Sequence, residues 1–360
     1  MKRLLSIPEY QGDLQRVVAL PLPWNKLRGK TILITGGTGL IGSFLIDVLA
    51  TAELGCNVLM LGRSEEKAKA RFAEYWNREW LKFVKWDALE PRITKIERMA
   101  SDENDNIDYV LHLASNTHPV AYATDPIGTI ATNVIALDAL LALASERRCQ
   151  RFLFASSVEI YGENRGDAEF FDEKYCGYID CNTLRAGYPE AKRCGEALCQ
   201  AYMRQKGLDC VIARLARTYG PTMLPTDTKA ISQFFRNALK GEDIVLKSEG
   251  RQHYSYQYVS DSVAGLLTVL LKGASGEAYN IAEASGDILL RDLATLIAEQ
   301  AGRHVVFELP TAIESAGFSK ATKARLNGDK IKALGWRPAF DIGLGVARTF
   351  EVLRSAGVIG

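Results

Sequence analysis

The feature that most constrains this chain is a short aliphatic run ending abruptly in glycines, TILITGGTGLIG at residues 31–42. TILIT is typical of a parallel strand covered on both faces, where polar and apolar residues need not alternate. Gly36 permits a tight turn, Gly39 lets a phosphate approach the backbone, and Gly42 lets the following helix pack against the strand. We predict that this helix, over residues 40–51, directs its first N–H groups at an anion. The alternative is a glycine turn without a ligand.

The rest of the chain alternates strand and helix patterns. Strands are expected near residues 57–61, 81–85, 107–113, 151–155 and 209–214. This alternation predicts an α/β fold, a Rossmann-type doubly wound parallel sheet with a smaller C-terminal substrate-binding lobe. We expect residues 1–27 to form an N-terminal extension that wraps the edge of the domain, and residues 28–220 to form the dinucleotide-binding domain. Segments near 255–283 are expected to complete that domain, and residues 221–360 to form mainly the second lobe.

Composition narrows the class of protein. The chain has 360 residues, 47% apolar and 24% charged, which fits a soluble globular protein. Its 44 basic and 43 acidic residues give no field that would attract nucleic acid. The N-terminus has no apolar segment typical of a signal peptide, and no 18-residue apolar run predicts a membrane span. Seven cysteines without CxxC spacing indicate reduced thiols in a cytoplasmic protein and no metal site.

Cofactor candidates begin at the glycine-rich turn, where Thr38, Leu40 and Ile41 join the three glycines. The second strand ends in Gly62 and Arg63, at the position where an acidic residue would bind an adenosine ribose hydroxyl. A guanidinium there favours a 2′-phosphate and hence NADP, although an arginine lying over the adenine is equally compatible with NAD. Asp87, after the third strand, is a candidate for the adenine amino group; the alternative is a solvated carboxylate.

The candidate catalytic residues follow the fifth strand. Tyr188 and Lys192 lie four residues apart in AGYPEAKRCGEAL, on one face of a predicted helix. An ammonium group beside a phenol, near a positively charged nicotinamide, favours the phenolate and lets tyrosine act as a base. Ser157, in the strand segment RFLFASSVEIYG, can hydrogen-bond the same substrate oxygen. A chance YxxxK on an amphipathic helix is the alternative.

Together these segments resemble the extended short-chain dehydrogenase/reductases, the NAD-dependent epimerase/dehydratase family, of the kind that modify nucleotide sugars. The similarity runs from about residue 30 to 350, through GGTGLIG, HLAS, DPIGTIATNVIAL, SSVEIYG, YPEAK, RTYGP, YVSD and LGWRP. The UDP-glucuronate decarboxylases and nucleotide-sugar 4,6-dehydratases are the most similar subfamilies, on the grounds of HPVAYATDP, ARLARTYGPTM and Arg185 just before Tyr188. The resemblance implies cofactor contacts from Leu113, Ala114, Ser115 and Asn133.

The resemblance also implies a chemistry. The tyrosine removes a proton from a sugar hydroxyl, usually at C4, while a hydride leaves the same carbon for NAD or NADP. The resulting ketone acidifies C5 and makes a C6 carboxylate a β-keto acid, so elimination, epimerisation or decarboxylation can follow. Dehydratases commonly carry an Asp-Glu pair after the serine, but here the pair is Val158 and Glu159. Glu159 is a candidate base at C5 or a partner for a carboxylate substrate; a surface carboxylate is the alternative.

Substrate contacts are expected from two regions. His118 and Tyr122, after the fourth strand, are candidates to line the sugar pocket, although a lone histidine is more often packed or solvated; His112, within that strand, is expected to be structural. The acidic loop at residues 163–184 is expected to fold over the sugar, or else to be a solvated run of charges.

The chain departs from its lookalikes at the expected pyrophosphate site. They usually carry an arginine at the position of Tyr254 and an asparagine at that of Arg217. We hypothesise that Arg217 binds the pyrophosphate while Tyr254 stacks or hydrogen-bonds in the same pocket. The alternative is that Arg217 pairs with a carboxylate and Arg251 reaches the phosphates.

Two other function classes remain open from the residues. A cofactor-binding sensor would not need Ser157, Tyr188 and Lys192 together. A reductase of small ketones would not need the second lobe, an argument from family analogy alone. The helix bearing Tyr188 and the segment 127–144 commonly form a dimeric four-helix bundle in lookalikes, so we expect a homodimer.

Overall fold

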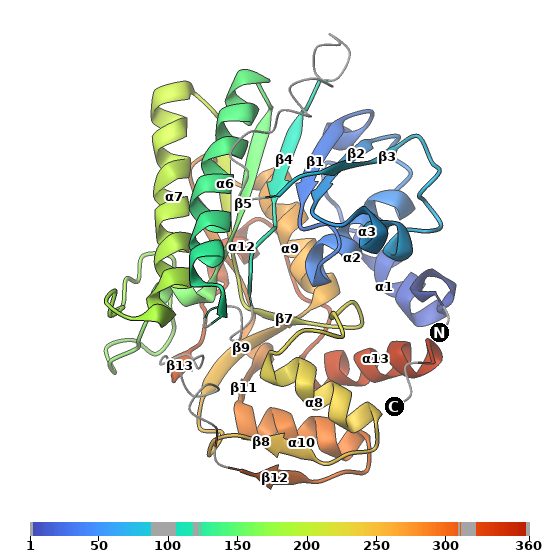
Figure 1. Ribbon diagram of the computed structural model, residues 1–360, viewed down its shortest axis with the longest axis vertical. Coiled ribbons are helices and arrows are strands. Elements are labelled where there is room, and N and C mark those ends of the chain that lie inside the picture. The colour runs from blue at the N-terminus through green and yellow to red at the C-terminus, as the bar shows by residue number, and fades with distance from the viewer. Residues whose placement is uncertain are drawn as a thin grey trace.

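The computed structural model describes residues 3–87, 106–117, 122, 124–308, 310 and 322–357. Its centre is a seven-stranded parallel sheet in the order β10-β6-β5-β4-β1-β2-β3 (Figure 1). The strands are β1 (Thr31–Thr35), β2 (Asn57–Gly62), β3 (Leu81–Lys85), β4 (Tyr109–His112), β5 (Arg151–Ser157), β6 (Cys210–Leu215) and β10 (Ala278–Ile281). The predicted doubly wound α/β fold is confirmed, and the sheet reverses its order between β1 and β4.

Helices cover both faces of this sheet. The paired helices α6 and α7 lie on one face against β4 and β5, and α2 and α9 lie on the other, with α1 packed outside them (Figure 1). The bounds are α1 (Pro8–Val18), α2 (Leu40–Thr51), α3 (Glu65–Arg71), α6 (Pro126–Glu146), α7 (Gly187–Lys206) and α9 (Val259–Lys272). Double coverage explains why the strands read as continuous apolar runs.

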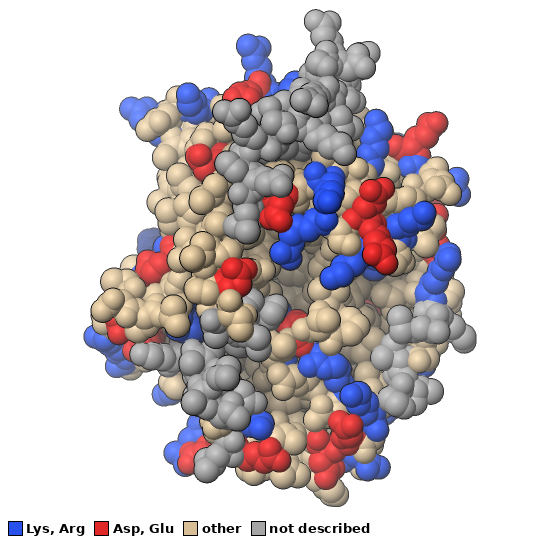
Figure 2. Space-filling view, in the orientation of Figure 1, with Lys and Arg blue, Asp and Glu red and all other residues tan. Residues whose placement is uncertain are grey.

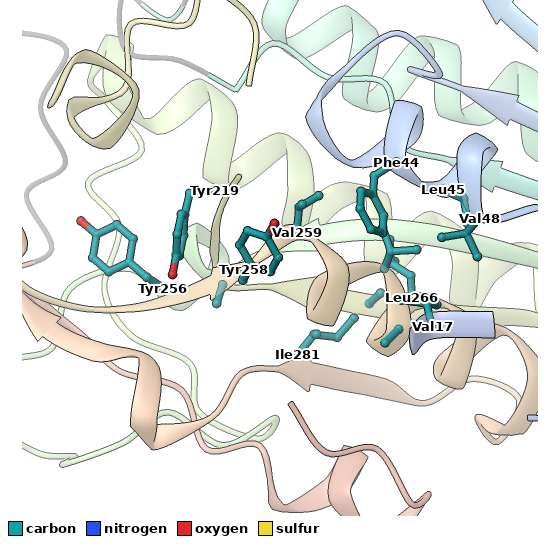
Figure 3. Close-up of a cluster of buried hydrophobic side chains, with 14 of the residues drawn as sticks. Val17, Phe44, Leu45, Val48, Tyr219, Tyr256, Tyr258, Val259, Leu266 and Ile281 are labelled. Carbon is teal, nitrogen blue, oxygen red and sulfur yellow. The ribbon is translucent and has the colours of Figure 1, made fainter. Parts of the chain in front are cut away.

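The N-terminal extension contributes a buried helix. In α1 the Tyr10 hydroxyl donates to Asp47 on α2 at 2.6 Å, and Asp13 accepts from the Tyr258 hydroxyl at 2.7 Å and from Arg348 at 2.8 Å. Apolar side chains from α1, α2, α9 and the sheet share one core with tyrosines of the second lobe (Figure 3). The helix therefore ties the sheet to the second lobe.

The second lobe holds two small sheets and several helices (Figure 1). Its central strand is β9, which pairs in parallel with β7 and β13 and antiparallel with β11, while β8 pairs with β12. The strands are β7 (Arg217–Tyr219), β8 (Ile244–Leu246), β9 (His253–Tyr258), β11 (Asp287–Leu289), β12 (Val305–Phe307) and β13 (Lys323–Ala324). The helices of this lobe are α8 (Ala230–Leu239), α10 (Leu290–Gln300) and α13 (Ile342–Ser355), whereas the short helix α12 (Asp329–Ala333) packs against β10 of the large sheet and against α9. After β9 the chain returns through α9 and β10 to the large sheet.

Helix α6 is long and mostly apolar. No membrane span was expected, yet among the described helices α6 is long and apolar enough to cross a membrane, with 56% of its most apolar window buried inside the protein. Several polar residues interrupt its apolar sequence, so it contains no unbroken apolar run of 18 residues. A buried core helix meets the same criteria, and α6 packs against α7 and β4.

Charges and thiols agree with the composition. Basic and acidic side chains are interspersed over the face in Figure 2 instead of gathering by sign. All seven cysteines are described and each is a free thiol. Within the described ranges, no group of histidine, cysteine and carboxylate side chains is arranged to hold a metal ion.

Candidate active site

The glycine-rich turn between β1 and α2 has the geometry of a phosphate-binding loop. Gly36 has a φ of 72°, and a Cβ there would lie 2.8 Å from the backbone nitrogen of Ala114. A Cβ on Gly42 would lie 2.3 Å from the carbonyl oxygen of Gly36. Gly39 occupies the N-cap of α2 without a side-chain cap, so the first N–H groups of the helix are left for a ligand. These residues fit a dinucleotide pyrophosphate.

Gly42→Ala is therefore expected to abolish NAD(H) binding. The added methyl group would meet backbone on two sides, Gly36 and the Cα of Gly37, which cannot move aside like a side chain. Isothermal titration with NAD(H) measures the loss. Gly12→Ala is the matched control, because a Cβ at that helical position meets nothing within 4 Å. Wild-type affinity in the Gly42 variant would contradict the assignment of the turn.

Residues after β4 form the opposite wall of this site. The Ala114 N–H donates to the Thr35 hydroxyl at 3.1 Å, and that hydroxyl lies 2.8 Å from Nδ1 of His112. The Ser115 hydroxyl donates to the Asn133 side chain on α6 at 3.0 Å. The structure thus brings Ser115 and Asn133 together and holds Ala114 beside Gly36. His112 is fully buried and packs on Phe154, as expected of a structural residue.

Two other cofactor candidates lie at strand ends. Arg63 follows β2 and is exposed, and Asp87 follows β3 and is half-buried. Both are at the carboxyl edge of the sheet, where the ligands of open α/β sheets bind.

The three catalytic candidates meet where β5 ends beside α7. Tyr188 is 5% exposed and is hydrogen-bonded to Ser157. Lys192, one turn further along α7, has its ammonium 5.9 Å from the centre of the Tyr188 ring and donates to the carbonyl oxygen of Ala155 at 2.7 Å. The spacing that the sequence predicted therefore places all three groups around one point.

Burial shifts the pKa values of Tyr188 and Lys192. It raises the pKa of Tyr188 to about 12, against the lowering effect of Ser157 and of two nearby arginines. Burial also lowers the pKa of Lys192 to about 7, against the raising effect of Glu196. In the chain alone the phenol keeps its proton at neutral pH. Deprotonation then depends on added positive charge, which the nicotinamide of a bound cofactor would supply.

Glu159 lies within a buried ionic cluster beside this centre. Its carboxylate accepts from Arg185 at 2.6 Å and from Arg217 at 2.9 Å. Burial alone would raise the pKa of Glu159, but the two guanidinium groups outweigh it and the pKa is lowered. The carboxylate is thus ionised at neutral pH. It is not the surface carboxylate that was the alternative.

Aromatic rings cover both guanidinium groups. Arg185 lies 4.7 Å from the centre of the Tyr122 ring, which itself stacks on Tyr188 at 5.0 Å. Arg217 lies 3.9 Å from the centre of the Tyr254 ring. Buried nitrogens remain without an acceptor among the described residues, namely Nε and Nη1 of Arg185 and Nε of Arg217. Such donors are costly to leave unpaired, so they indicate an anionic ligand.

The structure leaves two substrate candidates outside this cluster. Arg251 has a side chain 78% exposed and pairs with its neighbour Glu249 at 2.7 Å. His118 lies outside the described residues. Of the two arginines considered for the phosphates, only Arg217 joins the cluster, and it pairs with a carboxylate there.

The sequence interpretation missed several polar residues that support the site. Thr222, at the start of the second lobe, donates to the carbonyl oxygen of Leu40 at 2.8 Å and so fixes the first turn of α2. Glu196 accepts from Ser156, next to Ser157, at 2.5 Å. Glu196 follows Lys192 by four residues on one helix face, a signal that was available in the sequence.

A parallel sheet with a phosphate-binding turn and a tyrosine, lysine and serine at its carboxyl edge defines the short-chain dehydrogenase/reductase class of enzyme. The chain belongs to the NAD dependent epimerase/dehydratase family, whose model matches residues 32–282. This membership confirms the resemblance that the sequence motifs indicated.

The chain is similar in sequence to proteins named as UDP-glucuronic acid decarboxylases. The chain is 32% identical over 326 residues to UDP-glucuronic acid decarboxylase 1 of Xenopus tropicalis, covering 90% of this chain and 72% of that protein. It is 31% identical to UDP-glucuronic acid decarboxylase 3 of Arabidopsis thaliana, covering 85% of this chain and 84% of that one.

Solved structures share the fold. UDP-glucose 4-epimerase of Thermotoga maritima, solved with UDP-glucose, is 26% identical with a TM-score of 0.77, covering 90% of this chain and 99% of that one. The dTDP-glucose 4,6-dehydratase of Streptomyces venezuelae, solved with NAD, is 25% identical with a TM-score of 0.77, covering 91% and 98%.

Proposed function

We propose that this protein is a nucleotide-sugar decarboxylase that oxidises the sugar of a UDP-linked uronic acid at C4 before it loses carbon dioxide. Two kinds of support converge. The relatives at 30–32% identity are named UDP-glucuronic acid decarboxylases. The site combines a buried tyrosine, serine and lysine with a cluster of two arginines and one glutamate.

Each residue has a role in this proposal. Tyr188 takes the proton of the C4 hydroxyl, Ser157 hydrogen-bonds the same oxygen, and Lys192 supplies positive charge beside the phenol. The glycine-rich turn at Gly36, Gly39 and Gly42 would hold NAD(P), which would supply the hydride acceptor for C4 and the source of the returning hydride. The 4-keto sugar is a β-keto acid, so its C5–C6 bond breaks to release carbon dioxide, the electron pair forms an enolate at C4 and C5, and C5 then takes a proton from water.

The observation that carries decarboxylation is the excess positive charge of the buried cluster. Arg185 and Arg217 share the single carboxylate of Glu159, and Arg185, which is not assigned to the pyrophosphate, retains two unpaired N–H donors among the described residues. A carboxylate substrate supplies the acceptors and the negative charge that the cluster lacks. A neutral hexose supplies only the acceptors.

The test is to incubate the protein with a panel of nucleotide sugars and follow product masses. Loss of carbon dioxide from UDP-glucuronate supports the proposal. Loss of water assigns a dehydratase, and conversion without a mass change assigns a 4-epimerase, the activity named for one structural neighbour. Native mass spectrometry of the purified protein separates a small-ketone reductase, which releases its cofactor at each turnover, from an enzyme that retains NAD(H).

We further propose that Arg217 contacts the substrate pyrophosphate, with Tyr254 packed against its guanidinium. Replacing Arg217 with Asn is expected to weaken UDP binding by about 1.5–3 kcal/mol, the scale of a hydrogen bond to a charged group. Titration with UDP and with NAD(H) measures this, and the NAD(H) affinity should not change. Arg251→Ala is the control, since that side chain is exposed and is expected to leave UDP binding intact. Equal binding by parent and Arg217→Asn would refute the phosphate contact.

Arg63 is the residue expected to determine whether the protein prefers NAD or NADP. We propose that this exposed guanidinium favours NADP by binding its 2′-phosphate; an arginine that lies over the adenine is equally compatible with NAD. Comparing NAD and NADP affinities of the parent and of Arg63→Ala decides between these roles.

We propose that the protein is a cytoplasmic homodimer that pairs through α6 and α7. Exposed isoleucines on α6, Ile127 at 79%, Ile130 at 44% and Ile135 at 49%, support an apolar contact there. Ile127→Glu is expected to shift the protein to monomer in sedimentation analysis. Leu344→Glu, which alters an exposed leucine on α13, is the control and should leave the dimer intact.

A further inference from the structure

The segment that carries Ser157 and Glu159 is held at both ends by one buried ion pair outside the reaction centre. This segment, residues 156–161, runs from the end of β5 through a short 3-10 helix (Val158–Tyr161). At its start the Ser156 hydroxyl donates to Oε1 of Glu196 at 2.5 Å. At its end Nη1 of Arg214 donates to the Tyr161 hydroxyl at 2.9 Å.

Glu196 and Arg214 bind each other through both carboxylate oxygens. Nε of Arg214 donates to Oε1 at 3.0 Å and Nη2 donates to Oε2 at 2.7 Å, and both side chains are nearly buried. Arg214 also donates to the carbonyl oxygen of Glu173 at 2.7 Å, and Tyr161 donates to Asn280 on β10 at 2.6 Å. A forked pair of this kind fixes direction as well as distance.

The pair also connects this segment to the helix that bears the other catalytic groups. Glu196 lies on α7, one turn beyond Lys192 and two turns beyond Tyr188. From the same helix Arg193 donates to the carbonyl oxygen of Ile160 at 2.7 Å. The distance between Ser157 and Tyr188 is therefore set by contacts of α7 and β6 with residues on either side of Ser157.

We infer that Glu196 and Arg214 are positioning residues, which hold the 156–161 segment in register with Tyr188 and Lys192 for the first oxidation step. The inference rests on the proposed catalytic roles of Ser157, Tyr188 and Lys192. Small displacements of reacting groups are sufficient to lower rates strongly.

Glu196 has a second, electrostatic effect. The groups that face Lys192 are Glu196, Cys199 and Tyr188 on α7 and His112 on β4. Burial lowers the pKa of Lys192 to about 7, and the Glu196 carboxylate opposes that shift. Removing this carboxylate lowers the pKa of Lys192 further, so the ammonium is lost at a lower pH. Removing Arg214 leaves the carboxylate in place and has no such effect.

The experiment compares Glu196→Gln and Arg214→Gln with a control ion pair at the other end of β5 and β6. Arg151 and Asp209 form a second ion pair, at 2.7 Å, at the opposite end of β5 and β6. Asp209→Asn therefore disrupts a comparable contact away from the catalytic segment. For each variant we would measure thermal unfolding, amide hydrogen exchange of residues 156–161, and the kcat, KM and pH profile for UDP-glucuronate.

Both variants of the pair are expected to exchange faster at residues 156–161 and to lose about 10- to 100-fold in kcat with little change in KM. Only Glu196→Gln should move the alkaline limb of the kcat profile to lower pH. Asp209→Asn should lower the unfolding temperature without any of these changes.

Two results would overturn the inference. The first is a hydrogen-exchange rate at residues 156–161 in Glu196→Gln that equals that of the parent. The second is an increase in exchange and a loss of kcat in Asp209→Asn as large as in Glu196→Gln, when both variants lose the same amount of unfolding temperature. If the parent converts no nucleotide sugar, the proposed function fails, while the exchange measurement still decides whether the pair holds the segment.

Discussion

Tyr188→Phe is expected to reduce turnover by about a hundredfold or more while leaving NAD(H) affinity unchanged. The substitution removes only the phenolic oxygen, and general base catalysis typically contributes a factor of this size. The ring remains to fill the buried space under Tyr122, which stacks on it at 5.0 Å. Steady-state kinetics with UDP-glucuronate and titration with NAD(H) measure the two effects separately.

A tyrosine on the same helix provides the control for this variant. The Tyr202 hydroxyl donates to Asp138 at 2.8 Å on the exposed side of α7. Tyr202→Phe removes the same atom at a distance from the reaction centre, so its turnover should match the parent. Near-normal activity in Tyr188→Phe would remove the tyrosine from the mechanism.

Glu159→Gln is expected to separate the two halves of the reaction if Glu159 acts after the oxidation, as a base at C5. The variant should still reduce bound cofactor when substrate is added, because Ser157, Tyr188 and Lys192 are unchanged, but it should form no decarboxylated product. Absorbance of the reduced nicotinamide and the product mass report the two steps. Equal loss of both signals would assign Glu159 to substrate binding instead.

The same substitution is expected to destabilise the fold by about 3–5 kcal/mol, the scale for breaking a buried pair by removing one partner. Arg185 and Arg217 would then share no carboxylate. Because the pKa of Glu159 is lowered from its usual value of 4.5, its stabilising effect is fully present above that pH and is lost as pH falls through the lowered pKa. Denaturant unfolding of parent and variant should therefore differ at pH 7 and converge in acid.

Glu190→Gln is the control for the stability effect. Glu190 also pairs with an arginine, Arg193 at 3.3 Å, but its side chain is 38% exposed. Exposed pairs contribute little because water and salt screen them. A loss of stability in Glu190→Gln as large as in Glu159→Gln would mean that burial does not set the size of the effect.

The parts predictable from sequence were those whose signals are local. The run at residues 31–42 predicted a strand, a turn and a helix, and the structure has β1 and then α2 from Leu40 to Thr51. Tyr188 and Lys192 could be paired because four residues span one helical turn. Their meeting with Ser157 followed from the rule that ligands bind at the carboxyl edge of a parallel sheet.

The contacts of Arg217 could not be predicted in this way. Arg217 begins β7, whereas Glu159 lies 58 residues earlier in a 3-10 helix, so no spacing rule relates them. The extension at residues 1–27 is similar. The hydrogen-bond partners of Asp13 are Tyr258 and Arg348, which lie 245 and 335 residues away along the chain. The packing of α6 against α7 is also a contact between segments far apart in the sequence, which no local pattern specifies.

The most direct test of the account uses UDP-glucuronate labelled with deuterium at C4 of the sugar. If Tyr188 initiates oxidation at C4 and the hydride returns to the same carbon, the product will have lost carbon dioxide and retained the deuterium. Mass spectrometry of the product reads both changes at once. Tyr188→Phe is run as a parallel sample. A product that keeps its carboxylate, or a decarboxylated product without deuterium, would contradict the account. Decarboxylation that persists in Tyr188→Phe would contradict it as well.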